Sequence, residues 1–167
     1  MSSESLVLSV MGCGYLGAVH AAAMASLGHE VIGIDVDAPK IDALARGEAP
    51  FFEPGLQEIL TEGIASRMLR FTTDMREAAG SAVHFVSVGT PQQRDGYAAD
   101  LSYVHAAIDS LLPHLRPGDI VAGKSTVPVG TAAVLAERIA PTGATLVWNP
   151  EFLREGWAVQ DLSLIHI

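Results

Sequence analysis

The stretch LVLSVMGCGYLG, residues 6–17, decides the fold of this 167-residue chain. Its apolar first half has the composition of a buried strand and stops at a turn where Gly12, Gly14 and Gly17 match the pattern G-x-G-x-x-G. The Ala-rich segment Leu16–Leu27 follows and is typical of a helix. A strand, a glycine turn and a helix in this order predict the opening unit of a dinucleotide-binding domain.

The residues of this unit have distinct physical tasks. Gly12 permits the tight turn, Gly14 lets the backbone approach a pyrophosphate, and Gly17 allows the helix to pack closely on the strand. The helix N-terminus offers unpaired N–H groups to the anion. Asp35 ends the next apolar run at roughly the 20-residue spacing of a carboxylate that binds ribose, which favours NAD over NADP. The alternative is a turn that only joins strand to helix, with Asp35 as a helix cap.

The rest of the chain alternates apolar runs with helix-like segments, which predicts an α/β fold with a doubly wound, mostly parallel, Rossmann-like sheet of about six strands. The runs are continuous and rich in β-branched residues, as expected of strands buried on both faces. The predicted strands are Leu6–Val10, Val31–Ile34, Met68–Phe71, Val83–Val88, Ile120–Ala122 and Thr145–Trp148. The predicted helices are Leu16–Leu27, Lys40–Ala45, Pro54–Glu62, Leu101–Leu112 and Ala132–Ile139. The predicted core contains Val10, Ile32, Ile34, Phe85, Val86, Val121 and Leu146.

Composition and charge narrow the range of partners. The chain carries 19 acidic and 10 basic residues, a formal net charge of −9, so its general field repels nucleic acids and anionic membranes. No apolar stretch is long enough to span a bilayer, and residues 1–9 lack the Lys or Arg that opens a signal peptide. We therefore expect a cytoplasmic protein with a small-molecule partner.

The only cysteine, Cys13, lies between two glycines of the turn. A thiol beside a helix N-terminus can have a lowered pKa, but a small side chain is the simpler requirement at this position. We interpret Cys13 as structural. The histidines show no spacing typical of metal ligands, so no metal site is predicted.

Residues Gly118–Ser125 match the P-loop pattern G-x-x-x-x-G-K-[ST], but their context excludes a P-loop. A P-loop follows its strand and opens a helix, whereas Ile120 and Val121 place the strand inside the motif. Pro128 also biases Val127 away from helical dihedral angles, so no helix is expected to start at the lysine.

Five motifs in order give a resemblance to a known family. GCGYLG opens the series, DVDAPKIDALARGEAPFFEPGL follows the second strand, VGTP ends at Pro91, KSTVPVGT spans Lys124–Thr131, and NPEFLREGWAVQD spans Asn149–Asp161. On these motifs the chain resembles the nucleotide-sugar dehydrogenases of the UDP-glucose/GDP-mannose dehydrogenase family. The resemblance implies enzymes that oxidise the primary alcohol of a nucleotide sugar to a carboxylate with two NAD, through a thioester on a cysteine.

The resemblance also implies roles for individual residues. Cofactor contacts are implied for Gly12, Gly14, Tyr15, Leu16, Gly17, Asp35, Lys40, Gly89, Thr90, Thr126 and Glu155. For catalysis, Thr126 is implied to position the water that cleaves the thioester, Glu151 to handle the proton of that water, and Glu155 to lie near the nicotinamide. The nucleotide sugar is expected to lie against Glu151, Phe152 and Leu153. UDP-glucose, oxidised to UDP-glucuronate, is our first choice of substrate, and GDP-mannose or UDP-N-acetylmannosamine is the alternative.

The residues themselves predict a helix from Asn149. Asn149 is a good N-cap, Pro150 suits the first helical position, and Glu151 favours the positive end of the helix. Such a helix would place Glu151 and Glu155 on one face, where two like charges raise the pKa of at least one of them. The alternative is a well-capped helix start with two solvated acids.

The chains of the family continue beyond the matched region. The resemblance implies that the nucleophilic cysteine, most of the uridine-diphosphate site and the contacts of a homodimer or larger oligomer lie there. We expect residues 1–161 to form an incomplete NAD-binding domain, inactive alone, and residues 162–167 to be a tail that does not match the family. The sheet is expected to be truncated at its C-terminal edge. We expect the chain from about Glu155 to be the least protected against hydrogen exchange, and its apolar tail to find no surface to pack against. A non-catalytic NAD-binding module is the alternative function.

Overall fold

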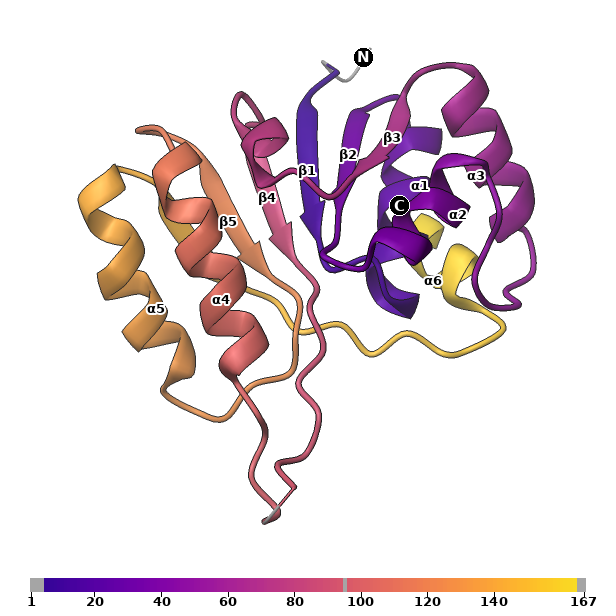
Figure 1. The fold of residues 1–167 in the computed structure, drawn as a ribbon. Coiled ribbons are helices and arrows are strands. Elements are labelled where there is room, and N and C mark those ends of the chain that lie inside the picture. The colour runs from indigo at the N-terminus through magenta and orange to yellow at the C-terminus, as the bar shows by residue number, and fades with distance from the viewer. Residues whose placement is uncertain (1–4, 95, 165–167) are drawn as a thin grey trace.

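A computed structural model describes residues 5–94 and 96–164, and these residues form one sheet of six parallel strands (Figure 1). The strands lie in the order β3-β2-β1-β4-β5-β6, so the winding reverses between β1 and β4. They are β1 (Val7–Met11), β2 (Glu30–Ile34), β3 (Leu69–Thr72), β4 (Val83–Val86), β5 (Ile120–Gly123) and β6 (Thr145–Trp148). The predicted doubly wound, Rossmann-like α/β fold is confirmed.

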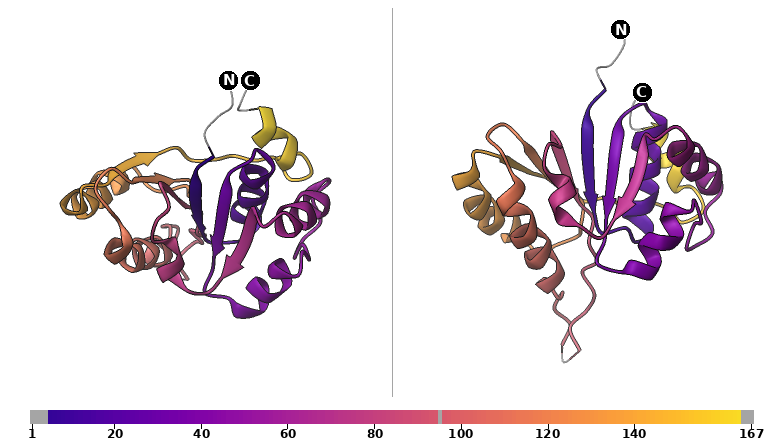
Figure 2. Two further views of the ribbon diagram at one scale, coloured as in Figure 1. Left: turned by 90° about the horizontal axis from the view of Figure 1, so that it is seen from above. Right: turned by 45° about the horizontal axis from the view of Figure 1, so that its top comes forward.

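Helices cover both faces of this sheet (Figure 2). Helices α1, α2, α3 and α6 pack on one face around Val10 and Val31, and α4 and α5 pack on the other face around Val86 and Val121. They are α1 (Tyr15–Ser26), α2 (Ala38–Ala45), α3 (Leu56–Ala65), α4 (Ser102–Leu111), α5 (Thr131–Ile139) and α6 (Ala158–Leu164). Short 3₁₀ turns span Met75–Ala78, Leu112–His114 and Ala140–Thr142. In residues 5–94 and 96–164, no helix is long and apolar enough to cross a membrane.

The predicted core is largely confirmed. Buried side chains are Val10, Ile32, Ile34, Val86 and Val121. Phe85 and Leu146 are only partly buried and pack at the margins of the two core clusters. At the start of α2, Asp37 caps the helix by accepting a hydrogen bond from the Lys40 amide.

The helix predicted from Asn149 is wrong. After β6 the chain continues beside the end of β5, where the Asn149 amide donates to the Gly123 carbonyl at 2.9 Å and the Glu151 amide donates to the Lys124 carbonyl at 3.2 Å. These bonds to a neighbouring segment replace the capping geometry that the local sequence favours. Helix α6 begins only at Ala158, so the two glutamates of this segment do not share a helix face.

The end of the chain does not stay at the β6 edge of the sheet. It crosses the molecule to α1, against which α6 packs (Figures 1 and 2). Ala158 and Leu162 are buried in that core, so the expectation that the apolar tail meets no surface is wrong for Leu162. The side chain of Leu164 and the whole of residues 165–167 lie outside the described residues. The low protection against hydrogen exchange that we expect from about Glu155 onward stays a prediction.

A buried polar cluster at the amino ends of the strands gives a pH-dependent prediction. Ser9 and His84 are partners in neighbouring strands, with the serine Oγ and the histidine Nδ1 2.7 Å apart. Burial lowers the pKa of His84, and the attraction of Asp119, whose Oδ2 lies 3.5 Å from Nε2, does not overcome this effect. The charges of Arg116 and His114 lower the pKa further.

Because the pKa of His84 is lower in the folded state, acid favours the unfolded state. The contribution of neutral His84 to the free energy of unfolding is constant well above the ordinary histidine pKa of about 6.5. It is lost as the pH drops through that value. We expect urea unfolding to show a lower free energy of unfolding at pH 5.5 than at pH 7.5. His84→Gln should be less stable at pH 7.5 but should lose less on acidification. An equal loss in both proteins would exclude His84 as the cause.

Candidate functional site

The glycine turn lies at the carboxyl end of β1, next to the end of β4. Gly12 has φ of +87°, and a Cβ on it would lie 2.8 Å from the backbone N and Cα of Val88. A Cβ on Gly17 would overlap the carbonyl oxygen of Gly12. Both positions therefore require glycine, because a Cβ at either one would clash with backbone atoms of a neighbouring segment. A Cβ on Gly14 would instead point into open space, which leaves that side free for a ligand.

The N-terminus of α1 faces outward from this turn. Its N-cap is Gly14, whose hydrogen side chain cannot accept a hydrogen bond, and its first turn, Tyr15–Ala18, carries only uncharged residues. The leading amides and the helix dipole together favour an anion at this end. The turn thus offers what a pyrophosphate needs.

Asp35 follows β2 and is tied to the turn. Its Oδ2 accepts hydrogen bonds from the Cys13 amide at 2.7 Å and from Lys40 Nζ at 3.0 Å, and its Oδ1 accepts from the Asp37 amide at 3.0 Å. Burial alone would raise the pKa of Asp35, but the bonds from Asp37, Lys40 and Cys13 outweigh it and hold the pKa below its usual range. A fixed, ionised carboxylate therefore stands beside the turn.

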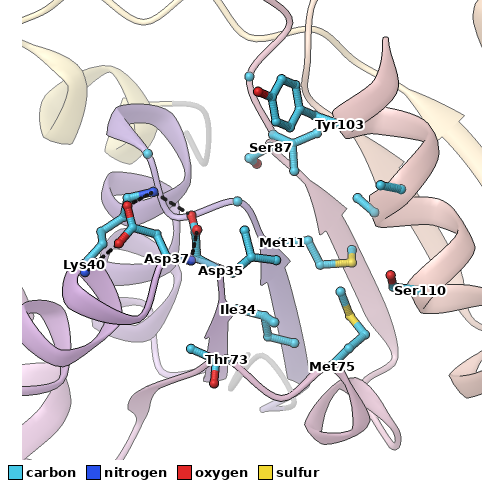
Figure 3. Close-up of a pocket in the computed structure, with 17 residues that line it drawn as sticks. Met11, Ile34, Asp35, Asp37, Lys40, Thr73, Met75, Ser87, Tyr103 and Ser110 are labelled. Atoms are coloured by element: carbon cyan, nitrogen blue, oxygen red, sulfur yellow. Dashed lines mark hydrogen bonds and ion pairs between the residues drawn. The ribbon is translucent and has the colours of Figure 1, made fainter.

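A cavity of about 580 Å³ opens next to these groups, between the strand ends and α4 (Figure 3). Asp35 and Lys40 lie on one side of it, and Tyr103 and Ser110 of α4 lie across from them. The apolar side chains that line it are Met11, Ile34, Met75, Val88, Ala106 and Ala107, with Val36 at the rim. An apolar cavity with a carboxylate at its edge fits the adenosine half of a dinucleotide.

The cavity brings together only part of the predicted cofactor residues. Those that line it are Gly12, Gly14, Asp35, Lys40 and Gly89. The others lie outside its lining: Tyr15, Leu16, Gly17, Thr90, Thr126 and Glu155. Gly17 is buried beneath the turn, and the Tyr15 hydroxyl donates a hydrogen bond to Glu53.

A second group of predicted residues gathers where β4 and β5 end. Thr90 Oγ1 donates a hydrogen bond to the Thr126 carbonyl at 2.9 Å. Glu151 reaches back to β5, where its Oε2 lies 3.1 Å from Lys124 Nζ. The lysine side chain is 7% exposed and that of the glutamate 16% exposed, so this is a largely buried ion pair. Thr90 directly follows Gly89, which lines the cavity, and Thr126 is bonded to Thr90. Glu151 reaches the same place through Lys124, two residues before Thr126.

The remaining predicted residues are spread along the irregular segment before α6. Phe152 is largely exposed, whereas Leu153 packs against the core that surrounds α1. Glu155 is exposed, and its charge contributes to raising the pKa of Tyr15. Leu153 therefore has a packing role in this chain, while Phe152 and Glu155 are free to meet a ligand.

The structure agrees with two further interpretations of the sequence. Cys13 is buried, and burial raises the pKa of its thiol, as expected of a structural cysteine. The P-loop match is coincidental, since β5 (Ile120–Gly123) lies inside it and Lys124 is paired with Glu151.

Sequence reasoning missed several residues of the site. Tyr103 and Met75 line the cavity, but each belongs to an element whose sequence shows only helical or turn composition. Lys124, the buried partner of Glu151, stood in the false P-loop match and at the start of the motif KSTVPVGT, but neither pattern assigned it a role. Glu53 was visible only as a letter in the motif FFEPGL. A search for charged residues next to strand ends would have indicated Lys124 but not the others.

The reversal of winding, the glycine turn, the fixed carboxylate and the adjoining cavity define a dinucleotide-binding domain of the Rossmann type. Residues 6–166 match the NAD-binding domain of the UDP-glucose/GDP-mannose dehydrogenase family. The chain belongs to this family. The family and the NAD cofactor predicted from the sequence are therefore confirmed.

Individual relatives agree with this assignment. The UDP-glucose 6-dehydrogenase of Rhizobium meliloti (strain 1021) is 43% identical over 161 residues, which cover 93% of this chain and 37% of that enzyme. A solved UDP-glucose dehydrogenase from the archaeon Pyrobaculum islandicum has a TM-score of 0.87 at 40% identity, over 95% of this chain and 39% of that one. A solved GDP-mannose dehydrogenase from Pseudomonas aeruginosa has a TM-score of 0.86 at 36% identity, and the match covers 92% of this chain and 38% of that enzyme. The chain thus spans less than two fifths of the length of these relatives.

The two kinds of glycine in the turn predict different defects. Gly17→Ala forces a Cβ into the Gly12 carbonyl, so we expect the free energy of unfolding to fall by about 3 kcal/mol, the upper end of an overpacking defect. Gly14→Ala meets open space and should fold with a stability within about 0.5 kcal/mol of the wild type. Its Cβ lies on the ligand side, so NAD affinity should fall at least about tenfold. Urea unfolding and NAD titration of both variants check this; unchanged NAD affinity in Gly14→Ala would remove Gly14 from the site.

Proposed function

We propose that this chain is the NAD-binding part of a dehydrogenase that oxidises UDP-glucose to UDP-glucuronate with two NAD. The observation that carries this proposal is the second group at the ends of β4 and β5. A domain that only binds NAD has no need of a buried Lys124–Glu151 pair and of an exposed Thr126 bonded to Thr90 at the same strand ends. Relatives whose names give the UDP-glucose activity support the choice of sugar.

The proposed roles follow from where each side chain lies. NAD, when bound, accepts a hydride. Asp35 would hold the adenosine ribose and the α1 amides would hold the pyrophosphate, and Gly89 at the end of β4 would face the other half of the cofactor. The ion pair with Lys124 fixes the position of the Glu151 carboxylate, whose oxygens would accept the proton of a water that cleaves a thioester. Thr126 lies exposed at the same strand ends and would position that water.

Glu155 and Phe152 complete the proposed site. Glu155 would lie near the nicotinamide and the reacting sugar, and exposed Phe152 would lie against the nucleotide sugar. For Leu153 the proposed contact is confined to its backbone, because its side chain is packed in the core. For the whole protein we infer a cytoplasmic homodimer or larger oligomer that has no nucleic-acid or membrane partner.

GDP-mannose and UDP-N-acetylmannosamine are the alternative substrates. They are supported by relatives whose names give those activities, including a GDP-mannose 6-dehydrogenase of Pseudomonas syringae pv. syringae that is 36% identical over 169 residues. A non-catalytic NAD-binding module is the alternative of a different class.

Chimeric enzymes test the proposal. Residues 1–161 would be joined to the remaining part of the Rhizobium meliloti UDP-glucose 6-dehydrogenase and, separately, of the Pseudomonas syringae GDP-mannose 6-dehydrogenase. We expect the first chimera to form two NADH per UDP-glucose, the stoichiometry of an alcohol oxidised to a carboxylate, and the second to retain less of its parent's activity. Glu151→Gln in the first chimera should give a burst of NADH and then stop. Folded chimeras that bind NAD but oxidise neither sugar would favour the non-catalytic module.

A further inference from the structure

Glu53 is a buried carboxylate that joins three distant parts of the chain. It lies in the loop between α2 and α3, and it is 5% exposed. Its Oε2 accepts hydrogen bonds from the Tyr15 hydroxyl and, at 2.7 Å, from the Gly156 amide. Its Oε1 accepts from the Ala158 amide at 2.8 Å. The cofactor turn and the segment that carries Glu155 are thus connected through one side chain.

The charge state of this connection is fixed at neutral pH. Burial alone would raise the pKa of Glu53, but the bonds from Tyr15 and from the Gly156 and Ala158 amides outweigh it and hold the pKa below its usual range. Burial and the hydrogen bond to Glu53 raise the pKa of Tyr15 to about 12. The tyrosine therefore stays a donor and the glutamate stays an acceptor.

The two ends of the connection lie at the two halves of the site. Tyr15 is the first residue of α1, whose amides we assign to the pyrophosphate. Gly156 has φ of +84°, and its amide belongs to the peptide bond with Glu155. Holding this amide fixes the backbone from which the Glu155 side chain projects. Phe51, beside Glu53, packs its ring on that of Tyr15 with the ring centroids 4.8 Å apart, which limits the movement of the tyrosine.

We propose that Glu53 is a positioning residue that couples NAD binding at the glycine turn to the placement of the Glu155 segment. This inference rests on the proposed function in that it gives Glu155 its place near the nicotinamide. NAD bound at the α1 amides would restrict the movement of the glycine turn and of Tyr15. Through its hydrogen bond, Tyr15 would then restrict Glu53, which binds the amides at the start of α6. Because coupling between two sites is reciprocal, an ordered α6 start also strengthens NAD binding.

Two variants separate the coupling from simple stabilisation. Glu53→Gln keeps the size of the side chain but removes its charge and one acceptor. Tyr15→Phe keeps the ring contact with Phe51 and leaves Glu53 bound to both amides. It removes the hydroxyl that bonds to Glu53 and that also accepts from the Gly156 amide at 3.3 Å, so it cuts the link between the turn and the start of α6. Glu58→Gln, an exposed carboxylate in the same region, is the matched control.

The measurement is amide hydrogen exchange of the full chain with and without NAD, together with NAD titration. In the wild type and in Glu58→Gln we expect NAD to slow exchange at Gly156 and Ala158 at least about fivefold, the lower end of typical coupling. In Tyr15→Phe, exchange at Ala158 in the NAD-free protein should match the wild type, because this amide bonds only to Glu53, whereas Gly156 should exchange faster because it loses its bond to the tyrosine hydroxyl. NAD should no longer slow exchange at either amide, and NAD affinity should fall roughly fivefold. In Glu53→Gln exchange at both amides should be faster even without NAD.

Two outcomes would overturn the proposal. One is NAD-induced slowing in Tyr15→Phe equal to that in the wild type, and the other is no slowing in the wild type itself. Should Glu53→Gln fail to fold, Tyr15→Phe still decides the coupling. The chimeric enzymes decide the oxidation of UDP-glucose separately, so failure of the coupling and failure of the proposed function are distinguishable.

Discussion

NAD should bind this chain roughly 100-fold more tightly than NADP, because a like-charge contact costs several kcal/mol and each 1.4 kcal/mol is a factor of ten in affinity. The contact is between the carboxylate of Asp35 and the 2′-phosphate of NADP. Asp35 cannot swing away easily, since the Cys13 and Asp37 amides hold its two oxygens. Its lowered pKa keeps it charged throughout the neutral range. Titration of both cofactors by calorimetry measures the ratio.

Two variants test whether Asp35 causes this preference. Asp35→Asn should lose most of the discrimination, because the amide is uncharged. Lys40 is the opposing case: its Nζ lies 3.0 Å from Asp35 and would attract a 2′-phosphate. Lys40→Met should therefore increase the preference for NAD. Equal affinities in the wild type, or a preference that survives in Asp35→Asn, would remove Asp35 from its assigned role.

The fold could be predicted because its signals are local. Most of the strands are short apolar runs, and the glycine turn with Asp35 at the end of the next strand indicates the type of sheet. The start of α2 is capped by Asp37 within the same few residues. Patterns of this kind need no knowledge of what the chain meets elsewhere.

The site could be predicted only where it depends on such local signals. The bond of Lys124 to Glu151 spans 27 positions of the chain, and that of Gly156 to Glu53 spans 103. No periodicity or spacing encodes contacts of this length. The error at Asn149 has the same cause, because bonds to Gly123 and Lys124 in a neighbouring segment outweigh a good local cap. The cavity residues Met75 and Tyr103 also become neighbours only through the winding of the sheet.

Lys124→Met should lower the free energy of unfolding by about 3 kcal/mol, since removal of one partner leaves the other charge buried and unpaired. For a domain of this size that is a fall in melting temperature of roughly 10 °C. Methionine fills nearly the same space as the lysine stem, so the loss reports charge and not packing. The control is Arg46→Met, which breaks the exposed pair with Glu48 and should change the free energy of unfolding by less than about 0.5 kcal/mol.

The double variant Lys124→Met with Glu151→Gln identifies the source of that loss. If the unpaired carboxylate is the cause, neutralising it should recover more than half of the lost stability, because a buried ion pair contributes little net stability compared with uncharged residues of similar volume. Additive losses in the two single variants would show instead that each side chain acts alone. The double variant would also separate the role of the ion pair in stability from the role of Glu151 in catalysis. Placed in the chimeric enzyme, it would have near wild-type stability but would lack the carboxylate that we assign to thioester cleavage. We expect that protein to bind NAD normally and to stop after the initial burst of NADH.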